Sequence, residues 1–206
     1  MANAFVYIDG FNFYYGAVKD TPYRWLDFSA LCARMLPGDK IVSIKYFTAI
    51  VSARPHDPQQ PVRQQVYLRA LRTIPNIEII LGHFLTHSCR MCLTGVVPPQ
   101  KVYVDKTEEK GSDVNIAAHL VHDGHLKRYE VAVVVSNDSD LMTPVRIVRQ
   151  ELGIPVGILN PHQHHSVALK PQATFMKRIR QADVAACQFP AIMNDARGQF
   201  HKPPTW

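Results

Sequence analysis

The segment Val131–Val135 (VAVVV), followed at once by Ser136–Asp140 (SNDSD), decides the fold class of this chain. Its apolar residues are continuous rather than alternating, which is typical of a strand that is covered on both faces. Phe5–Ile8 (FVYI) has the same character and is followed by Asp9. Strands of this kind belong to parallel sheets with helices on either side, so we expect an α/β protein.

Three further apolar segments are expected to be strands of the same sheet, namely Ile41–Ile50, Ile77–Leu81 and Ile154–Leu159. Helical spacing of apolar residues lies between the strands and predicts helices at 28–35, 61–71, 114–121 and 141–148. Because strand and helix alternate through most of the chain, the sequence predicts a three-layer α/β/α sandwich with a central, mainly parallel sheet.

Composition limits the class of protein. The hydrophobic content of 47% and the charged content of 19% are those of a globular domain, which excludes a disordered or fibrous chain. No stretch reaches the ~20 apolar residues of a membrane span, and the N-terminus lacks the basic region and cleavage site of a secretory signal. We therefore expect a cytoplasmic protein without a membrane partner. The formal charge of +6 modestly favours a polyanionic partner.

The expected domain spans 1–176 and carries an insert at about 83–105 that interrupts the alternation. This insert contains Cys89 and Cys92, several prolines and an alternating segment, and is predicted to be a loop or hairpin. The weakly patterned segment 177–206 is predicted to be a tail that packs loosely or is partly disordered.

Four aspartates are placed where a parallel sheet binds its ligands. Asp9 ends the first strand, Asp138 and Asp140 follow the strand at 131–135, and Asp113 lies in the first turn of the helix before it. Ligands of open α/β sheets bind beyond the carboxyl ends of the strands, at the point where strand order reverses. If the two strands are neighbours there, the four carboxylates share one edge.

Each aspartate taken alone can be explained as a helix cap or a turn residue. Together, however, the like charges repel one another unless a cation neutralises them, so the cluster predicts Mg²⁺ or Mn²⁺. Asn12, three residues after Asp9, is expected either to orient a metal-bound water or phosphate, or to cap the following helix.

Polar residues near this edge are candidate contacts for a polyanionic substrate. They are Arg54, Lys106, Lys110 and Ser136. A second candidate metal site lies in the insert, where Cys89 and Cys92 have zinc-ligand spacing and His83 or His87 could complete the set. Two unliganded thiols are the alternative, and the sequence leaves both open.

Three segments resemble the signature segments of NYN domains, the PIN-like proteins of the LabA/DUF88 group. They are Tyr7–Asn12 (YIDGFN), Lys110–Val114 (KGSDV) and Val135–Leu141 (VSNDSDL), and the resemblance runs from about Phe5 to Lys177. The family commonly has glycine at the position of Asn137, and asparagine tolerates left-handed backbone angles better than other residues do.

The resemblance implies a PIN-like sandwich and a metal-dependent ribonuclease. Its acidic site would match Asp9, Asp113, Asp138 and Asp140, with Asn12 beside them. The expected reaction is hydrolysis of a phosphodiester by metal-bound water, with single-stranded RNA as substrate and endonucleolytic cleavage. The preference for RNA over DNA comes from the resemblance alone.

The sequence also excludes and leaves open other functions. It has no Gly-rich phosphate loop, and Phe11 stands at the third position of what would be an Asp-x-Asp-x-Thr motif, which excludes kinases and covalent phosphatases. The alternatives that remain are a DNA-directed nuclease and a module that binds RNA or protein without cleaving it. A homo-oligomer is left open as well.

Overall fold

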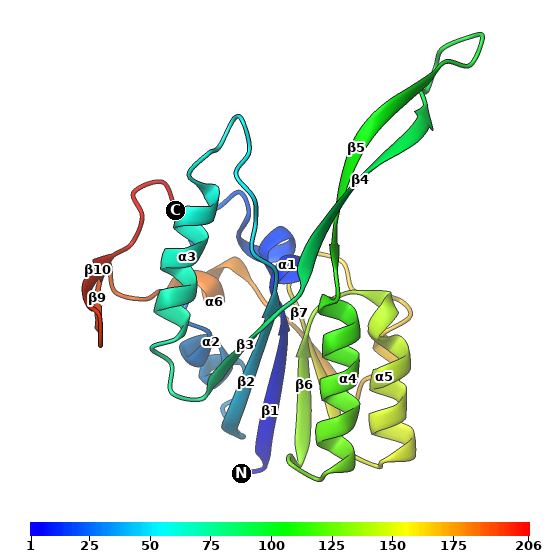
Figure 1. Ribbon diagram of the computed structural model, residues 1–206. Coiled ribbons are helices and arrows are strands. Elements are labelled where there is room, and N and C mark those ends of the chain that lie inside the picture. The colour runs from blue at the N-terminus through cyan, green and yellow to red at the C-terminus, as the bar shows by residue number, and fades with distance from the viewer.

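The computed structural model describes the whole chain, residues 1–206. The chain alternates strands and helices along most of its length (Figure 1). The strands are β1 (Asn3–Asp9), β2 (Lys40–Thr48), β3 (Ile77–Leu81), β4 (His83–Cys92), β5 (Lys101–Lys110), β6 (Val131–Val135), β7 (Val156–Asn160), β8 (Phe175–Arg178), β9 (Ile192–Asp195) and β10 (Gly198–His201). The helices and short helical turns are α1 (Gly10–Phe13), η1 (Tyr14–Val18), α2 (Phe28–Met35), α3 (Gln60–Leu71), α4 (Ser112–His125), η2 (Ser139–Leu141), α5 (Met142–Arg146), η3 (Ile147–Glu151), η4 (Lys170–Gln172) and α6 (Gln181–Ala186).

The central sheet has six strands in the order β3-β2-β1-β6-β7-β8, and every neighbouring pair is parallel. From β1 the chain builds outward through β2 to β3 and then returns to place β6 on the other side of β1. The order of strands therefore reverses between β1 and β6, which confirms that these two strands are neighbours at the switch point.

Helices cover both faces of the sheet, which confirms the three-layer sandwich (Figure 1). In β1, Val6 and Ile8 point into a core shared with α2, α3 and α6, whereas Tyr7 points into a second core shared with α4 and α5. Strand β6 divides its side chains in the same way. Since successive side chains of a strand point to opposite faces, a strand between two cores must be apolar at every position.

Charged and polar side chains meet at the buried Asp123 beside the second core. The Asp123 carboxylate accepts hydrogen bonds from the Tyr7 hydroxyl at 2.8 Å, from Lys45 Nζ at 2.6 Å and from Arg128 Nη1 at 2.9 Å. Asp123 is fully buried and Lys45 is 5% exposed, so both charges depend on their partners.

The predicted insert is a hairpin of β4 and β5, paired in register from His83 with Lys110 to Cys92 with Lys101. It projects beyond the sheet as a long two-stranded arm (Figure 1). Its base places Lys110 directly before α4, and the arm therefore begins beside the edge of the sheet where Asp113 lies.

The segment 177–206 does not form the loose tail that its sequence predicts. It contains the end of β8, helix α6 and the β9–β10 hairpin, and Val184, Phe189 and Phe200 are buried in the first core. Arg69 of α3 forms two hydrogen bonds with Asp195, each 2.7 Å long. The prediction was wrong because the apolar residues of this segment are isolated, without the periodicity of a single long element.

No helix combines the length with the apolar character that crossing a bilayer demands.

Candidate active site

Asp9 lies at the end of β1, buried beneath the edge where β1 and β6 meet. Its side chain is 4% exposed and accepts hydrogen bonds from the backbone N–H of Asn12 at 2.9 Å and from the Ser136 hydroxyl at 3.1 Å. The first bond makes Asp9 the N-cap of α1. The carboxylate is therefore held in one orientation by elements from both sides of the switch point.

Asp138 follows β6 and faces the same edge. Its carboxylate caps η2 by accepting from the Asp140 N–H at 3.0 Å, while its own N–H donates to the Ser136 hydroxyl at 3.1 Å. Ser136 thus bridges Asp9 and Asp138. Ser136 is fully buried and its hydroxyl is used between the two aspartates, so in this structure it positions them and is not exposed for the substrate contact that the sequence predicts.

Asn12 holds the loops of this edge together. Its Oδ1 accepts from the Asn137 N–H at 3.0 Å and lies 3.1 Å from His162 Nε2. The His162 ring packs on Gly16, where a Cβ atom would lie 2.7 Å from the ring. In this structure the Asn12 oxygen is used within the protein, so Asn12 fixes the loop that carries Asp138.

Asn137 takes part in the same framework. Its side chain donates to the carbonyl of His164 at 3.1 Å and accepts from the N–H of Ser166 at 2.7 Å. The only non-glycine residue with positive φ is Lys127. The backbone of Asn137 is therefore not left-handed, although asparagine would tolerate such angles. Asparagine serves here through its side chain, which anchors the loop after β7.

Asp113 is half-buried in the first turn of α4, where it faces the loop after β6. A further carboxylate, which the sequence analysis missed, is Glu109 at the end of β5. Glu109 accepts from the N–H and the hydroxyl of Ser112, at 3.2 and 2.8 Å. Its place four residues before Asp113 is the signal that could have identified it.

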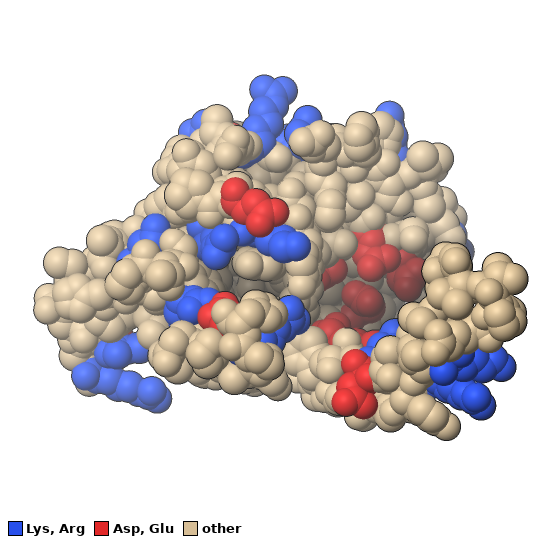
Figure 2. Space-filling view, turned by 90° about the horizontal axis from the view of Figure 1, so that it is seen from above, with Lys and Arg blue, Asp and Glu red and all other residues tan.

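The carboxylates act on one another electrostatically. The pKa of Asp9 is raised to about 6, chiefly by burial and to a smaller extent by the charges of Asp113 and Asp138, while the hydrogen bonds from Asn12 and Ser136 act to lower it. The pKa of Asp113 is also raised. Burial is the largest cause, and the charges of Asp138, Glu109 and Asp140 raise it as well. Figure 2 shows acidic side chains gathered in a hollow of the face seen from above, and the mutual proximity of Asp113, Asp138, Glu109 and Asp140 agrees with a negatively charged edge.

The hollow brings the predicted acids together without placing them at coordination distance. No three or more His, Cys, Asp or Glu side chains are arranged so that together they could hold a metal ion. The donor set nonetheless fits a hard divalent cation, because it consists of carboxylates, and the charges of neighbouring carboxylates raise the pKa of Asp9 and of Asp113. Mg²⁺ in particular keeps several waters and needs only one or two protein carboxylates.

The predicted substrate contacts fall in different surroundings. Lys106 and Lys110 are exposed on β5 and both pair with Glu108, the latter at 3.0 Å. Their hydrogen bonds lower the pKa of Glu108 to about 2. Such exposed pairs are weak, so both ammonium groups remain able to exchange Glu108 for a phosphate. Arg54 lines a cavity that adjoins the acidic hollow.

The predicted zinc ligands lie on the arm and are not brought together. Cys89 and Cys92 are three residues apart in the regular strand β4, so their side chains leave opposite faces of the hairpin. They are free thiols, and His83 and His87 do not join them in a group that could hold a metal. The residues of this segment do not fit a tetrahedral zinc site in this conformation.

Comparison with known proteins gives relatives for this arrangement. The chain is 30% identical to 6-hydroxy-3-succinoylpyridine 3-monooxygenase HspA of Pseudomonas putida (strain DSM 28022 / S16), over 98% of this chain and 74% of that protein. The structure is similar to that of a protein of unknown function from Vibrio parahaemolyticus RIMD 2210633. The TM-score is 0.57 at 18% identity, and the match covers 87% of this chain and 93% of the other.

The profile of the NYN domain family matches residues 3–178, which include all the acidic residues of the hollow and the whole central sheet. The three segments quoted above as resembling that family supply Asp9, Asn12, Asp113, Asp138 and Asp140, and the fold brings them to one edge. This chain therefore belongs to the NYN domain family.

Proposed function

We propose that this protein is a metal-dependent ribonuclease that hydrolyses phosphodiester bonds of single-stranded RNA at the acidic hollow. The NYN family is typically a family of nucleases that act on nucleic acids. The observation that carries the proposal is the hollow itself, where the charges of Asp113 and Asp138 raise the pKa of Asp9, and the charge of Asp138 also raises the pKa of Asp113.

The acidic residues of the hollow and the lysines of the arm would have different roles. Asp9 is fixed by two hydrogen bonds and, with Asp138 and Asp113, would bind Mg²⁺ or Mn²⁺. A bound divalent ion lowers the pKa of a coordinated water and stabilises the charge that develops on the phosphate. Lys106 and Lys110 at the base of the arm would contact the phosphates of the strand on either side.

The bond changes are those of hydrolysis. The oxygen of a water forms a bond to phosphorus, the bond from phosphorus to the leaving ribose oxygen breaks, and that oxygen gains a proton. None of the proposed side chains becomes covalently attached to the substrate. The residues of this chain orient the phosphate and the water and balance the charge, which is sufficient for phosphoryl chemistry.

The Pseudomonas relative is named as a monooxygenase of a pyridine derivative, a different class of reaction. Oxygenation of a ring and hydrolysis of a phosphodiester place different demands on a site. The acidic hollow offers grouped carboxylates, which suit metal-assisted hydrolysis of a phosphate ester, and we base the proposal on them.

The test is a cleavage assay with labelled single-stranded RNA and single-stranded DNA. We expect RNA to be cut in the presence of Mn²⁺ or Mg²⁺ and to remain intact in EDTA. Cleavage of DNA in place of RNA would identify a DNA-directed nuclease. Tight binding of RNA without cutting, under both metals, would identify a binding module and refute the proposal.

Metal binding can be measured separately from cleavage. We expect Mn²⁺, titrated by calorimetry, to bind the protein and to raise its melting temperature. Replacing both Asp9 and Asp138 by asparagine should abolish this binding, because it exchanges two anionic carboxylates, the ligands that a hard divalent cation prefers, for neutral amides. Asparagine preserves both capping bonds, so the fold should persist. Unchanged binding in the double variant would contradict the assignment.

A further inference from the structure

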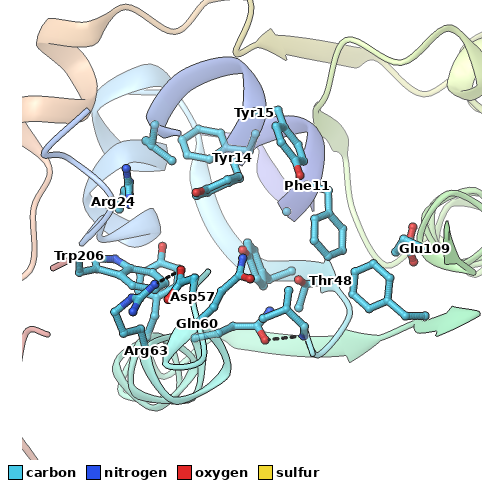
Figure 3. Close-up of a pocket in the computed structure, with 18 of the residues that line it drawn as sticks. Phe11, Tyr14, Tyr15, Arg24, Thr48, Asp57, Gln60, Arg63, Glu109 and Trp206 are labelled. Atoms are coloured by element: carbon cyan, nitrogen blue, oxygen red, sulfur yellow. Dashed lines mark hydrogen bonds and ion pairs between the residues drawn. The ribbon is translucent and has the colours of Figure 1, made fainter. Parts of the chain in front are cut away.

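A cavity of about 370 Å³ lies beside the acidic hollow, within the size range of small-molecule sites (Figure 3). It is bordered by α1, η1 and α3, by the carboxyl end of β2, and by the base of the β4–β5 arm. Gly10 and Glu109 line it at the end nearer the acidic hollow, so the two features are neighbours. Eleven of its 21 lining residues are hydrophobic.

The apolar part of the cavity consists mainly of aromatic rings. Phe11 meets Phe84 edge to face at a centroid distance of 5.6 Å, and Tyr14 meets Tyr15 in the same way at 5.3 Å. Figure 3 shows these tyrosines and Phe11 around the middle of the cavity. Rings that surround an open space offer faces and edges to a planar group placed between them.

Polar side chains of this cavity lack partners. Four buried side-chain nitrogen or oxygen atoms of the protein have no hydrogen-bond partner, and three belong to residues that line the cavity: Arg24 Nε, Gln60 Oε1 and Trp206 Nε1. Buried polar groups are nearly always hydrogen-bonded, so three such atoms at one cavity point to a ligand. They supply two donors and one acceptor.

Charged residues are distributed unevenly along the cavity. Three arginines, Arg24, Arg54 and Arg63, line it against the two carboxylates Asp57 and Glu109. Arg63 is already paired with Asp57, whose pKa it lowers. Figure 3 shows Arg24, Arg63 and Trp206 together at one end and Glu109 at the other. The excess positive charge is therefore at the end remote from the acidic hollow.

We propose that this cavity binds a planar heteroaromatic ring that carries an anionic group. Arg24 and the Trp206 indole N–H bind the anion, the aromatic side chains enclose the ring, and the Gln60 carbonyl oxygen accepts a hydrogen bond from the ligand. A charged hydrogen bond from a guanidinium and stacking on rings are the interactions that these chemical groups prefer. Two sources provide this chemistry, a nucleotide or a free heteroaromatic carboxylate.

The proposal does not rest on cleavage at the acidic hollow. A nucleotide in this cavity would be the neighbour of the one being cut, whereas a free acid would use the cavity on its own. Because Glu109 and Gly10 border both features, the two sites are close, but their binding residues are different side chains.

The experiment is calorimetric titration of the full chain with adenosine 5′-monophosphate and with nicotinate. Adenosine, which has a ring without an anion, and inorganic phosphate, which has the anion alone, are the control ligands. We expect one or both of the first two probes to bind with one site per chain, at least about tenfold tighter than either control.

Variants locate the binding. Arg24→Gln and Trp206→Phe should each weaken it, the first by about tenfold or more because a charged donor is lost. The matched control is Arg72→Gln, exposed just beyond the C-terminal end of α3, which should bind as the wild type does. Trp206→Phe keeps an aromatic ring, so it tests the donor alone even if Arg24→Gln does not fold.

The possible results distinguish a nucleotide site from a site for small acids, and both from the absence of a binding site. Binding of the nucleotide alone identifies a nucleotide site, and binding of nicotinate alone identifies a site for small acids. Asp138→Asn should bind the probe unchanged, so a loss of cleavage is distinguishable from a loss of this site. Absence of saturable binding by both probes, or binding that both cavity variants leave unaltered, overturns the proposal.

Discussion

Asp138→Asn is expected to lower the rate of metal-dependent RNA cleavage by on the order of a hundredfold or more. The substitution removes one charge from the acidic hollow and weakens the binding of the ion that activates water. It leaves the local backbone intact, because asparagine also caps helices and can accept the Asp140 N–H that Asp138 accepts now. Asp9→Asn should act in the same way, since its capping bond is also preserved.

Folding and binding should survive this change. The melting temperature without metal should be unchanged or higher, because like charges no longer face one another. RNA binding should be kept or tightened, since a negative charge leaves the path of a polyanion. Cleavage and binding are measured on one labelled RNA. Asp39→Asn, at the opposite end of the sheet before β2, is the control that should cut normally. Full activity of Asp138→Asn would exclude Asp138 from the reaction.

Asp123→Asn is expected to lower the free energy of unfolding by about 3 to 5 kcal/mol, far from the acidic hollow. The substitution leaves the Lys45 ammonium buried without its carboxylate, which now lies 2.6 Å away. The remaining carboxylate near Lys45, that of Glu78, is 3.8 Å away and largely exposed, so it compensates weakly. Urea unfolding at neutral pH measures the loss. Glu151→Gln breaks the exposed Arg146–Glu151 pair and should cost less than about 1 kcal/mol.

The Asp123 carboxylate should also make the free energy of unfolding depend on pH. Burial acts to raise the pKa of Asp123, but the hydrogen bonds from Lys45, Tyr7 and Arg128 and the charge of Lys45 together outweigh it and hold the pKa below its usual value. A folded-state pKa below the unfolded one means that the stabilisation is present above the unfolded pKa and is lost as pH falls through the folded value. The wild type should therefore lose more stability on acidification than Asp123→Asn does. Parallel pH profiles for the two proteins would contradict this role of Asp123.

Local patterns were sufficient for the central elements of the fold. β3, β6 and α2 begin and end at the predicted residues, because each is a short apolar segment or a helical repeat with clear boundaries. The edge strand β8 of the central sheet was not predicted, since Phe175–Arg178 is short and half polar. It is a strand because β7 offers it a parallel edge, and this pairing is not encoded in its own residues.

The acidic site shows the same division between local and tertiary information. The sequence by itself determined which residues stand at strand ends and helix starts, and therefore that Asp9, Asp113, Asp138 and Asp140 meet at one edge. Only the tertiary structure decided that Ser136 is buried between two aspartates and that Asn12 holds the neighbouring loop. Those roles depend on distances between segments more than 120 residues apart.

The cavity beside the site was beyond sequence reasoning for the same reason. Its partnerless groups come from Arg24, Gln60 and Trp206, which belong to three separate parts of the chain. Periodicity and local motifs report how a residue relates to its neighbours in sequence, and they determined the sheet and the acidic edge. Burial and hydrogen-bond satisfaction depend on which surfaces meet after folding, so only the tertiary structure decided where polar groups lack partners.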